Sequence, residues 1–119
     1  LADASVTFRS PSYEFDLQGW DDLEPFFDEH FTDTRFGLHH GHNPEIRVDG
    51  DDATGVWYLH DVFINLEEET RLEGSAVYRD QYRRVDSGWR IASMDYERLF
   101  EMTQPLPDGV DIAARPTRR

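Results

Sequence analysis

Hydrophobic positions recur with helical spacing near the start of the chain, in the segment GWDDLEPFFDEHF at residues 19–31. The large apolar side chains stand three or four residues apart and would form one face of an α-helix: Leu23, Phe26, Phe27 and Phe31. Asp21 or Asp22 can cap this helix, and Pro25 falls in its first turn, where no amide donor is needed. The segment therefore predicts a single amphipathic helix.

Hydrophobic residues follow a two-residue period in most of the remaining chain, which predicts β-strands. Two short strands are expected at 5–8 and 12–15, separated by the turn sequence RSPS. Four long strands are expected at 34–48, 53–65, 71–85 and 89–102. The sequence DGDD between the first two of them is the clearest hairpin turn. Strands that are neighbours in sequence usually pair, so the four long strands predict an antiparallel meander.

The segment 53–65 carries apolar residues on both faces of the predicted strand. The two faces are made of alternate residues: Val56, Tyr58, His60, Val62 and Ile64 on one, and Trp57, Leu59, Asp61 and Phe63 on the other. Two apolar faces predict that both are covered, one by the helix and core and the other by a second subunit, which implies a homodimer. The pattern leaves open which face points inward.

The composition indicates one small globular domain without disulfides, since the chain has 119 residues and no cysteine. A net charge of −13 argues against nucleic acid and against an anionic membrane surface as partners. No apolar run is long enough to span a membrane, and a cytoplasmic location is expected. The proline-rich, aperiodic segment 103–119 is expected to be an arm or a disordered tail.

Three histidines, His39, His40 and His42, fall within four positions and raise the question of a metal site. Zinc and ferrous iron need ligands that converge, whereas on a strand His40 and His42 point to one face and His39 to the other. A bulge at Asn43 and Pro44 could change this, with a nearby aspartate adding an oxygen ligand. We expect no metal and no cofactor.

Acid–base chemistry fits these side chains better, because the unperturbed pKa of histidine lies close to neutrality. His60 is a further candidate, and its alternative role is that of a core histidine bonded to a tyrosine or an aspartate. Tyr78 and Asp80 share a strand face with the small residues Gly74 and Ala76, and they could orient a substrate oxygen there. The alternative for that pair is a structural cross-strand hydrogen bond.

Two segments, HHGHNPEIRVDGDDATGVWYL and EGSAVYRDQYRRVDSGWRIASMDYERLFE, resemble the SnoaL-like branch of the nuclear transport factor 2-like superfamily. The resemblance covers residues 1–102, and its most specific part is G-x-x-x-Y-x-D-x-Y-x-R followed by G-W-R-I. It implies an α+β fold in which a highly curved antiparallel sheet wraps around helices into a cone. It also implies two further helices upstream of Leu1, the first of which carries an aspartate in the family.

The same resemblance implies a site and a reaction. In the family's dehydratases a histidine four residues before an asparagine faces the cavity, and His39 with Asn43 matches that pattern. His39 is therefore the expected catalytic residue, and the expected substrate-binding residues are Asn43, Tyr58, His60, Tyr78 and Asp80. The implied activity is cofactor-independent lyase (dehydratase) or isomerase chemistry on a small hydrophobic, oxygenated ligand of polyketide or steroid type. The alternatives are a non-catalytic module that binds a hydrophobic ligand or supports assembly, and the structural small subunit of a ring-hydroxylating dioxygenase.

Overall fold

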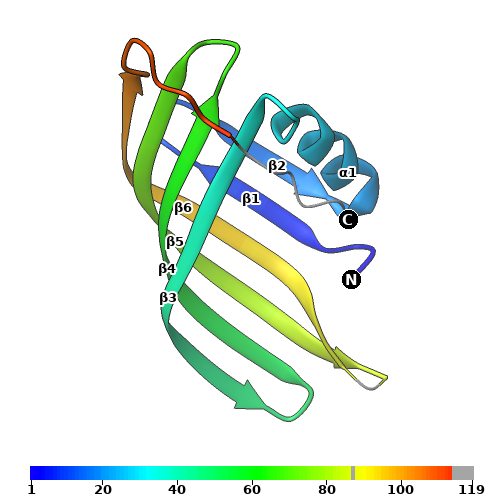
Figure 1. The fold of residues 1–119 in the computed structure, drawn as a ribbon. Coiled ribbons are helices and arrows are strands. Elements are labelled where there is room, and N and C mark those ends of the chain that lie inside the picture. The colour runs from blue at the N-terminus through cyan, green and yellow to red at the C-terminus, as the bar shows by residue number, and fades with distance from the viewer. Residues whose placement is uncertain (87, 114–119) are drawn as a thin grey trace.

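One helix and six strands make up the part of the chain that the computed structural model describes, residues 1–86 and 88–113. In chain order the elements are β1 (Ser5–Arg9), β2 (Glu14–Gln18), α1 (Gly19–His30), β3 (Arg35–Asp49), β4 (Asp52–Asn65), β5 (Thr70–Val85) and β6 (Gly88–Pro105). The strands form one sheet in the order β2-β1-β6-β5-β4-β3. Figure 1 shows this sheet as a curved, unclosed layer, with α1 beside β2. The expected α+β fold with a strongly curved sheet is confirmed.

The four long strands form the predicted antiparallel meander, in which β3, β4, β5 and β6 pair in sequence order. The DGDD turn closes the β3–β4 hairpin as expected, with Asp49 paired to Asp52 and Gly50 at a φ of +60°. The sheet is nevertheless mixed, because β1 runs parallel to β6. The meander leaves one edge of β6 unpaired, and β1 satisfies the backbone groups of that edge.

The second short strand begins at Glu14, later than the predicted 12–15. The hydroxyl of Ser10 accepts hydrogen bonds from the amides of Ser12 and Tyr13. A serine side chain that binds the backbone in this way stabilises a turn. The turn therefore extends past the proline and shifts the start of the strand.

The helix α1 begins at Gly19, before the residues that were expected to cap it, and this changes two details of the prediction. Gln18 is the N-cap residue, and the side chain of Asp22 accepts a hydrogen bond from its amide at 2.8 Å. Gly19 adopts a φ of +73°, and a Cβ there would lie 2.8 Å from the carbonyl oxygen of Ala2. Only glycine fits this position, where the extended chain of β2 turns into the helix. The prediction that Pro25 lies in the first turn is therefore wrong, since this proline is inside the helix.

The sheet has one face that packs against α1, which we call the inner face, and an opposite outer face. Phe26 of α1 stacks on Phe8 of β1 with ring centroids 5.2 Å apart, and Phe8 also contacts Tyr96. The core on this face contains Leu59, Ala76 and Tyr96, with Phe8 and Tyr78 packed against it. Leu59 and its face of β4 therefore point inward, and the face with Val56, Tyr58 and His60 points outward.

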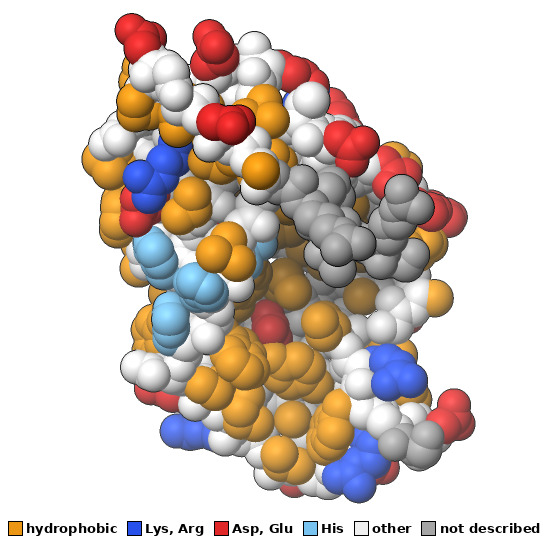
Figure 2. Space-filling model, viewed as in Figure 1, with side chains coloured by type: hydrophobic (Ala, Val, Ile, Leu, Met, Phe, Trp, Pro, Cys, Tyr) orange, Lys and Arg blue, Asp and Glu red, His pale blue; other side chains and the backbone are white. Residues whose placement is uncertain are grey.

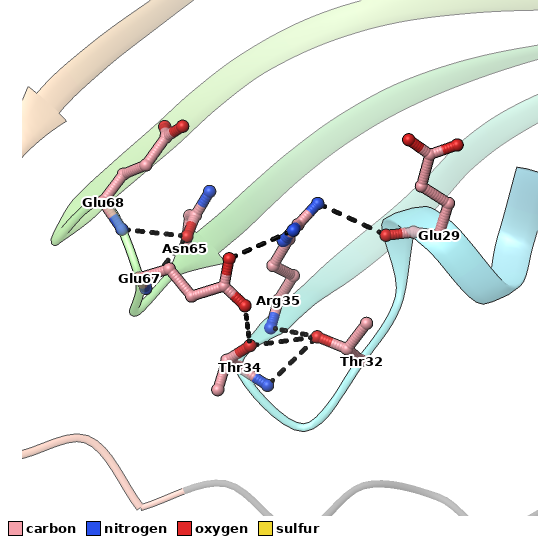
Figure 3. Close-up of polar contacts among 7 residues, drawn as sticks. All are labelled: Glu29, Thr32, Thr34, Arg35, Asn65, Glu67 and Glu68. Atoms are coloured by element: carbon pink, nitrogen blue, oxygen red, sulfur yellow. Dashed lines mark hydrogen bonds and ion pairs between the residues drawn. The ribbon is translucent and has the colours of Figure 1, made fainter.

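A network of polar contacts ties the loop between α1 and β3 to the turn between β4 and β5 (Figure 3). Glu67 accepts hydrogen bonds from Thr34 at 2.6 Å and from Arg35 at 3.0 Å. Arg35 also donates to the carbonyl oxygen of Glu29, while the side chain of Asn65 accepts the amide hydrogen of Glu67. The network holds the first residues of β3 in register with the end of β4.

The end of the chain differs from the prediction at one boundary. The strand β6 continues to Pro105, where it pairs with Thr70, so the predicted arm from 103 begins inside the sheet. Residues 114–119 of that arm lie outside the described residues. Within the described part of the chain, α1 is too short and too polar to cross a membrane.

Candidate active site

His39 lies on the inner face of β3, directly opposite Asp61 of β4 in the antiparallel ladder. The imidazole Nε2 is 3.9 Å from Asp61 Oδ2, and the ring meets the edge of Phe31 with centroids 6.1 Å apart. The His39 side chain is 42% exposed, whereas that of Asp61 is 5% exposed. A substrate can therefore reach the imidazole while the carboxylate behind it stays shielded from water.

A buried arginine holds Asp61 in place. Arg98 Nη1 donates a hydrogen bond to Asp61 Oδ2 at 3.0 Å and also contacts the hydroxyl of Tyr96. Its Nε lies 3.1 Å from Glu101 Oε2. Among the described residues, Arg98 Nη2 and Asp61 Oδ1 are buried without a hydrogen-bond partner. A buried donor and acceptor left unpaired are available to polar groups of a ligand.

The space for Arg98 comes from Gly74, the residue beside Glu101 on the neighbouring strand. A Cβ at position 74 would lie 2.5 Å from Arg98 Nη2 and 2.5 Å from the carbonyl oxygen of Phe100. Small residues such as Gly74 and Ala76 on this strand could in principle leave room for a substrate. At Gly74 the guanidinium fills that room instead.

The electrostatic environment keeps His39 neutral near neutral pH. Burial lowers the pKa of His39 below 6.5, Asp61 raises it in part, and the positive charge of Arg98 lowers it again. A neutral imidazole can accept a proton, which is the state that a general base requires.

Two tyrosines complete the inner face around this pair of residues. Tyr78 and Tyr96 pack with ring centroids 5.2 Å apart. Burial, together with the charges of Asp61 and Asp80, raises the pKa of Tyr78 to about 12. Tyr78 therefore keeps its proton over the whole neutral range and can donate a hydrogen bond to a substrate oxygen.

Asp80 forms a second polar group further along the inner face of β5. Its Oδ2 accepts a hydrogen bond from the Tyr82 hydroxyl at 2.7 Å, and that hydroxyl accepts one from Trp57 Nε1 at 2.8 Å. Asp80 is 7% exposed, and burial raises the pKa of its carboxyl group although the Tyr82 bond opposes the shift. The structure therefore provides the intrastrand hydrogen bond of a structural role, and it also leaves Oδ1 unpaired among the described residues.

The structure brings only part of the predicted set together. His39, Tyr78 and Asp80 share the inner face, whereas Tyr58 and His60 lie on the outer face. His60 Nε2 lies 2.9 Å from Glu73 Oε1 there. The two residues fall on the far side because side chains alternate along β4, and Leu59 and Asp61 occupy the inner positions.

Asn43 occupies the bulge that the sequence suggested. The β3–β4 register shifts between His42 and Glu45, and Asn43 has a φ of +44°. Asparagine tolerates this left-handed conformation better than most residues. The side chain is exposed and four residues along the strand from His39, so a backbone role accounts for its position.

Arg98 was not predicted from the sequence, and Asp61 was predicted to have only a minor role. The available signal was the pattern Y-E-R in β6, which places Arg98 on the same face as Tyr96. A bulge in β6 then changes the alternation, since Ala76 pairs with Arg98 but Ser75 pairs with Phe100. That irregularity is not visible in the sequence.

Metal ligation is not favoured on the inner face. Among the described residues, no group of three or more His, Asp or Glu side chains is arranged to hold a metal ion. Arg98 also occupies the position beside Asp61 where a cation would otherwise bind. The inner face is instead suited to proton transfer and hydrogen bonding.

Comparisons with known proteins agree on the fold. Residues 2–95 match the family model of the SnoaL-like domain. The chain is similar to a protein provisionally assigned as a scytalone dehydratase from Novosphingobium aromaticivorans, with 20% identity, coverage of 100% of this chain and 75% of that one, and a TM-score of 0.74. It is similar to a hexachlorocyclohexane dehydrochlorinase from Novosphingobium barchaimii, with 17% identity, coverage of 97% and 76%, and a TM-score of 0.72. A third structure, provisionally assigned as an aromatic ring hydroxylase from N. aromaticivorans, has 17% identity, coverage of 87% and 73%, and a TM-score of 0.77.

Proposed function

Because the chain belongs to the SnoaL-like domain family, we propose that it is a small-molecule enzyme of the lyase or isomerase kind. Its substrate would be a hydrophobic, oxygenated molecule of polyketide or steroid type, and the reaction would need no cofactor. His39 would act as the general base and then as the general acid. The observation that carries this proposal is the pairing of a partly exposed, neutral imidazole with the buried carboxylate of Asp61.

The proton transfers follow from this pairing. His39 removes a proton from a carbon next to a substrate carbonyl, and the electron pair of the broken C–H bond moves toward the carbonyl oxygen. Asp61, 3.9 Å away, stabilises the imidazolium that forms. In an isomerisation the imidazolium returns the proton to another carbon. In a dehydration it protonates the departing β-hydroxyl group, and water leaves.

The carbonyl oxygen needs hydrogen-bond donors as negative charge develops on it. Tyr78 is a phenol that stays protonated, and Arg98 Nη2 is a buried donor without a partner among the described residues. Donors that are already oriented toward the developing charge make a large contribution to catalysis. Tyr58, which was also predicted to bind the substrate, lies on the outer face of the sheet.

The apolar character of the inner face supports a hydrophobic substrate. Figure 2 shows a hollow on this side of the molecule that is lined largely by hydrophobic side chains. Exposed apolar residues such as Ile46 and Val48 on β3 add to this surface. A mostly apolar lining with a few oriented polar groups is typical of small-molecule sites.

The names of two structural relatives are consistent with elimination chemistry. One is named as a dehydrochlorinase and one as a scytalone dehydratase, and both names describe the loss of a small molecule from a substrate. The third is named for aromatic ring hydroxylation, so the names do not converge on one reaction. The fold hosts several activities, and the proposal therefore rests on the His39 site.

The alternative function is a module that binds a hydrophobic ligand without changing it. One observation favours it: the distance of 3.9 Å between His39 and Asp61 is longer than a hydrogen bond, and Arg98 already neutralises Asp61. In that case His39 would only contact the ligand.

A His39→Ala variant separates the two functions. Wild type and variant are tested against a panel of polycyclic β-hydroxyketones, with turnover followed by mass spectrometry and binding by calorimetry. Loss of a general base lowers the rate by about 10²–10⁴-fold while binding is retained. Unchanged turnover in the variant would contradict the catalytic role of His39, and binding without turnover in the wild type would support the ligand-binding module. His30→Gln serves as the control, because His30 packs on Phe26 in α1 and lies outside the pair.

We also infer a homodimer formed through the outer face, on the side of β5 and β6. Large apolar side chains of β6 are exposed there, among them Phe100 at 54% and Met102 at 45%. Exposed apolar residues gathered on one face are a feature of interaction surfaces. Light scattering on metal-free protein should give twice the monomer mass of 14.0 kDa. A monomeric mass at micromolar concentration would contradict this inference.

A further inference from the structure

We propose that the outer face of β3 and β4 carries a binding site for a divalent transition metal such as Zn²⁺, formed by His40, His42 and His60. His40 and His42 are two residues apart on β3 and therefore share a face. His60 lies directly opposite His40 in the β3–β4 ladder. Figure 2 shows histidine side chains gathered over the edge of the molecule where these strands lie.

The imidazole of His40 lies near those of both His42 and His60. The ring centroid of His40 is 6.1 Å from that of His42 and 6.3 Å from that of His60. Zinc–nitrogen bonds of about 2.0–2.1 Å in tetrahedral geometry bring ring centroids to roughly 5 Å. As they stand, no three ligand side chains among the described residues converge on one point. The three side chains are exposed, so rotations about their side-chain bonds can bring the rings together around one ion.

A second observation independently suits metal binding at this place. His60 Nε2 lies 2.9 Å from Glu73 Oε1, while the other carboxylate oxygen of Glu73 accepts a hydrogen bond from Arg71 at 2.6 Å. Among the described residues His60 Nδ1 has no hydrogen-bond partner, so this nitrogen can bind the ion. A metal-binding histidine usually donates its other ring N–H to a carboxylate, which fixes the ring and increases its basicity.

The ligand type selects the class of metal. Imidazole nitrogens suit zinc, copper and nickel, whereas magnesium and calcium require oxygen ligands. Three histidines leave the fourth tetrahedral position to water. All the proposed ligands come from one copy of the chain. The zinc site is also separate from the proposed catalytic pair, because His39 and Asp61 lie on the opposite face of the same two strands.

The test is a calorimetric titration of tag-free, EDTA-treated protein with ZnCl₂ at pH 7.5. The proposal predicts one zinc ion per chain. It predicts a loss of more than tenfold in affinity for His40→Ala and for His60→Ala, with the fold checked by circular dichroism. Glu73→Gln should weaken zinc binding by about 10–100-fold, the usual effect of losing a carboxylate behind a metal-binding histidine.

His39→Gln is the matched control, since it removes a neighbouring histidine that points to the other face. Its zinc affinity should equal that of the wild type. Calcium provides a second control, because a general attraction of cations to a chain of charge −13 would bind calcium as well. Absence of zinc binding, equal binding of calcium, or unchanged affinity in both His40→Ala and His60→Ala would overturn the proposal.

Discussion

His39 and Asp61 face each other across the β3–β4 ladder, with the imidazole Nε2 3.9 Å from a carboxylate oxygen that Arg98 also binds. The arrangement places one partly exposed base in front of a buried ion pair. The positive charge of Arg98 balances the buried carboxylate of Asp61.

Arg98→Met should destabilise the protein strongly. The substitution keeps an apolar chain in the space but leaves the buried carboxylate of Asp61 without its counter-charge. Removal of one partner from a buried ion pair costs about 3–5 kcal/mol in the free energy of unfolding. Urea denaturation measures this difference. A loss below about 1 kcal/mol, the range of surface ion pairs, would show that the pair is well solvated.

Gly74→Ala should also destabilise the fold, by about 1–3 kcal/mol, because the new methyl group would overlap Arg98 and the backbone of Phe100. Gly41→Ala is the matched control on the same face. A Cβ at position 41 would meet Trp57 at 3.5 Å, an ordinary contact. The two variants are compared by thermal unfolding. Equal melting temperatures would mean that Arg98 moves aside without cost.

Asp80→Asn should raise stability at pH 7. Burial raises the pKa of Asp80 above 3.8, so its contribution to stability is lost as the pH rises through that pKa. An asparagine oxygen can still accept the Tyr82 hydrogen bond. The gain over wild type should therefore be largest near neutrality and should shrink toward pH 3.8.

The control for Asp80→Asn is Asp33→Asn, which removes one negative charge from an exposed loop. It corrects for the general relief of repulsion in an acidic chain. If both variants gain the same stability at pH 7, desolvation of Asp80 is not the cause.

With an identified substrate, catalysis should persist below the pH at which an ordinary histidine is protonated. The pKa of His39 lies below 6.5, and the base is active only when neutral. The acidic limb of kcat/KM against pH should therefore fall below pH 6.5. A limb above pH 7 would assign the base to another group.

Much of the fold could be predicted from the sequence because its signals are local. The apolar stripe of Leu23, Phe26 and Phe27 predicted α1, and the DGDD turn predicted the β3–β4 hairpin. The parallel pairing of β1 with β6 could not be predicted, since it depends on an unpaired edge that exists only after the meander has formed.

The candidate site was predicted less completely for a similar reason. His39 was identified from a short motif, but its partners Asp61 and Arg98 come from two other strands. The choice between His60 and Asp61 as the inner residue depended on a register of one position. Packing of Leu59 in the core makes that choice, and a single strand pattern contains no information about it.

The most direct test of the His39–Asp61 pair needs no substrate. The pKa of His39 is measured by NMR titration of its ring protons in wild type and in Asp61→Asn, with the signal assigned by its loss in His39→Gln. The account predicts a pKa below 6.5 in the wild type and a lower one in Asp61→Asn, because the carboxylate raises the pKa and Arg98 opposes it. A wild-type pKa at or above 6.5, or no change in Asp61→Asn, would contradict the account.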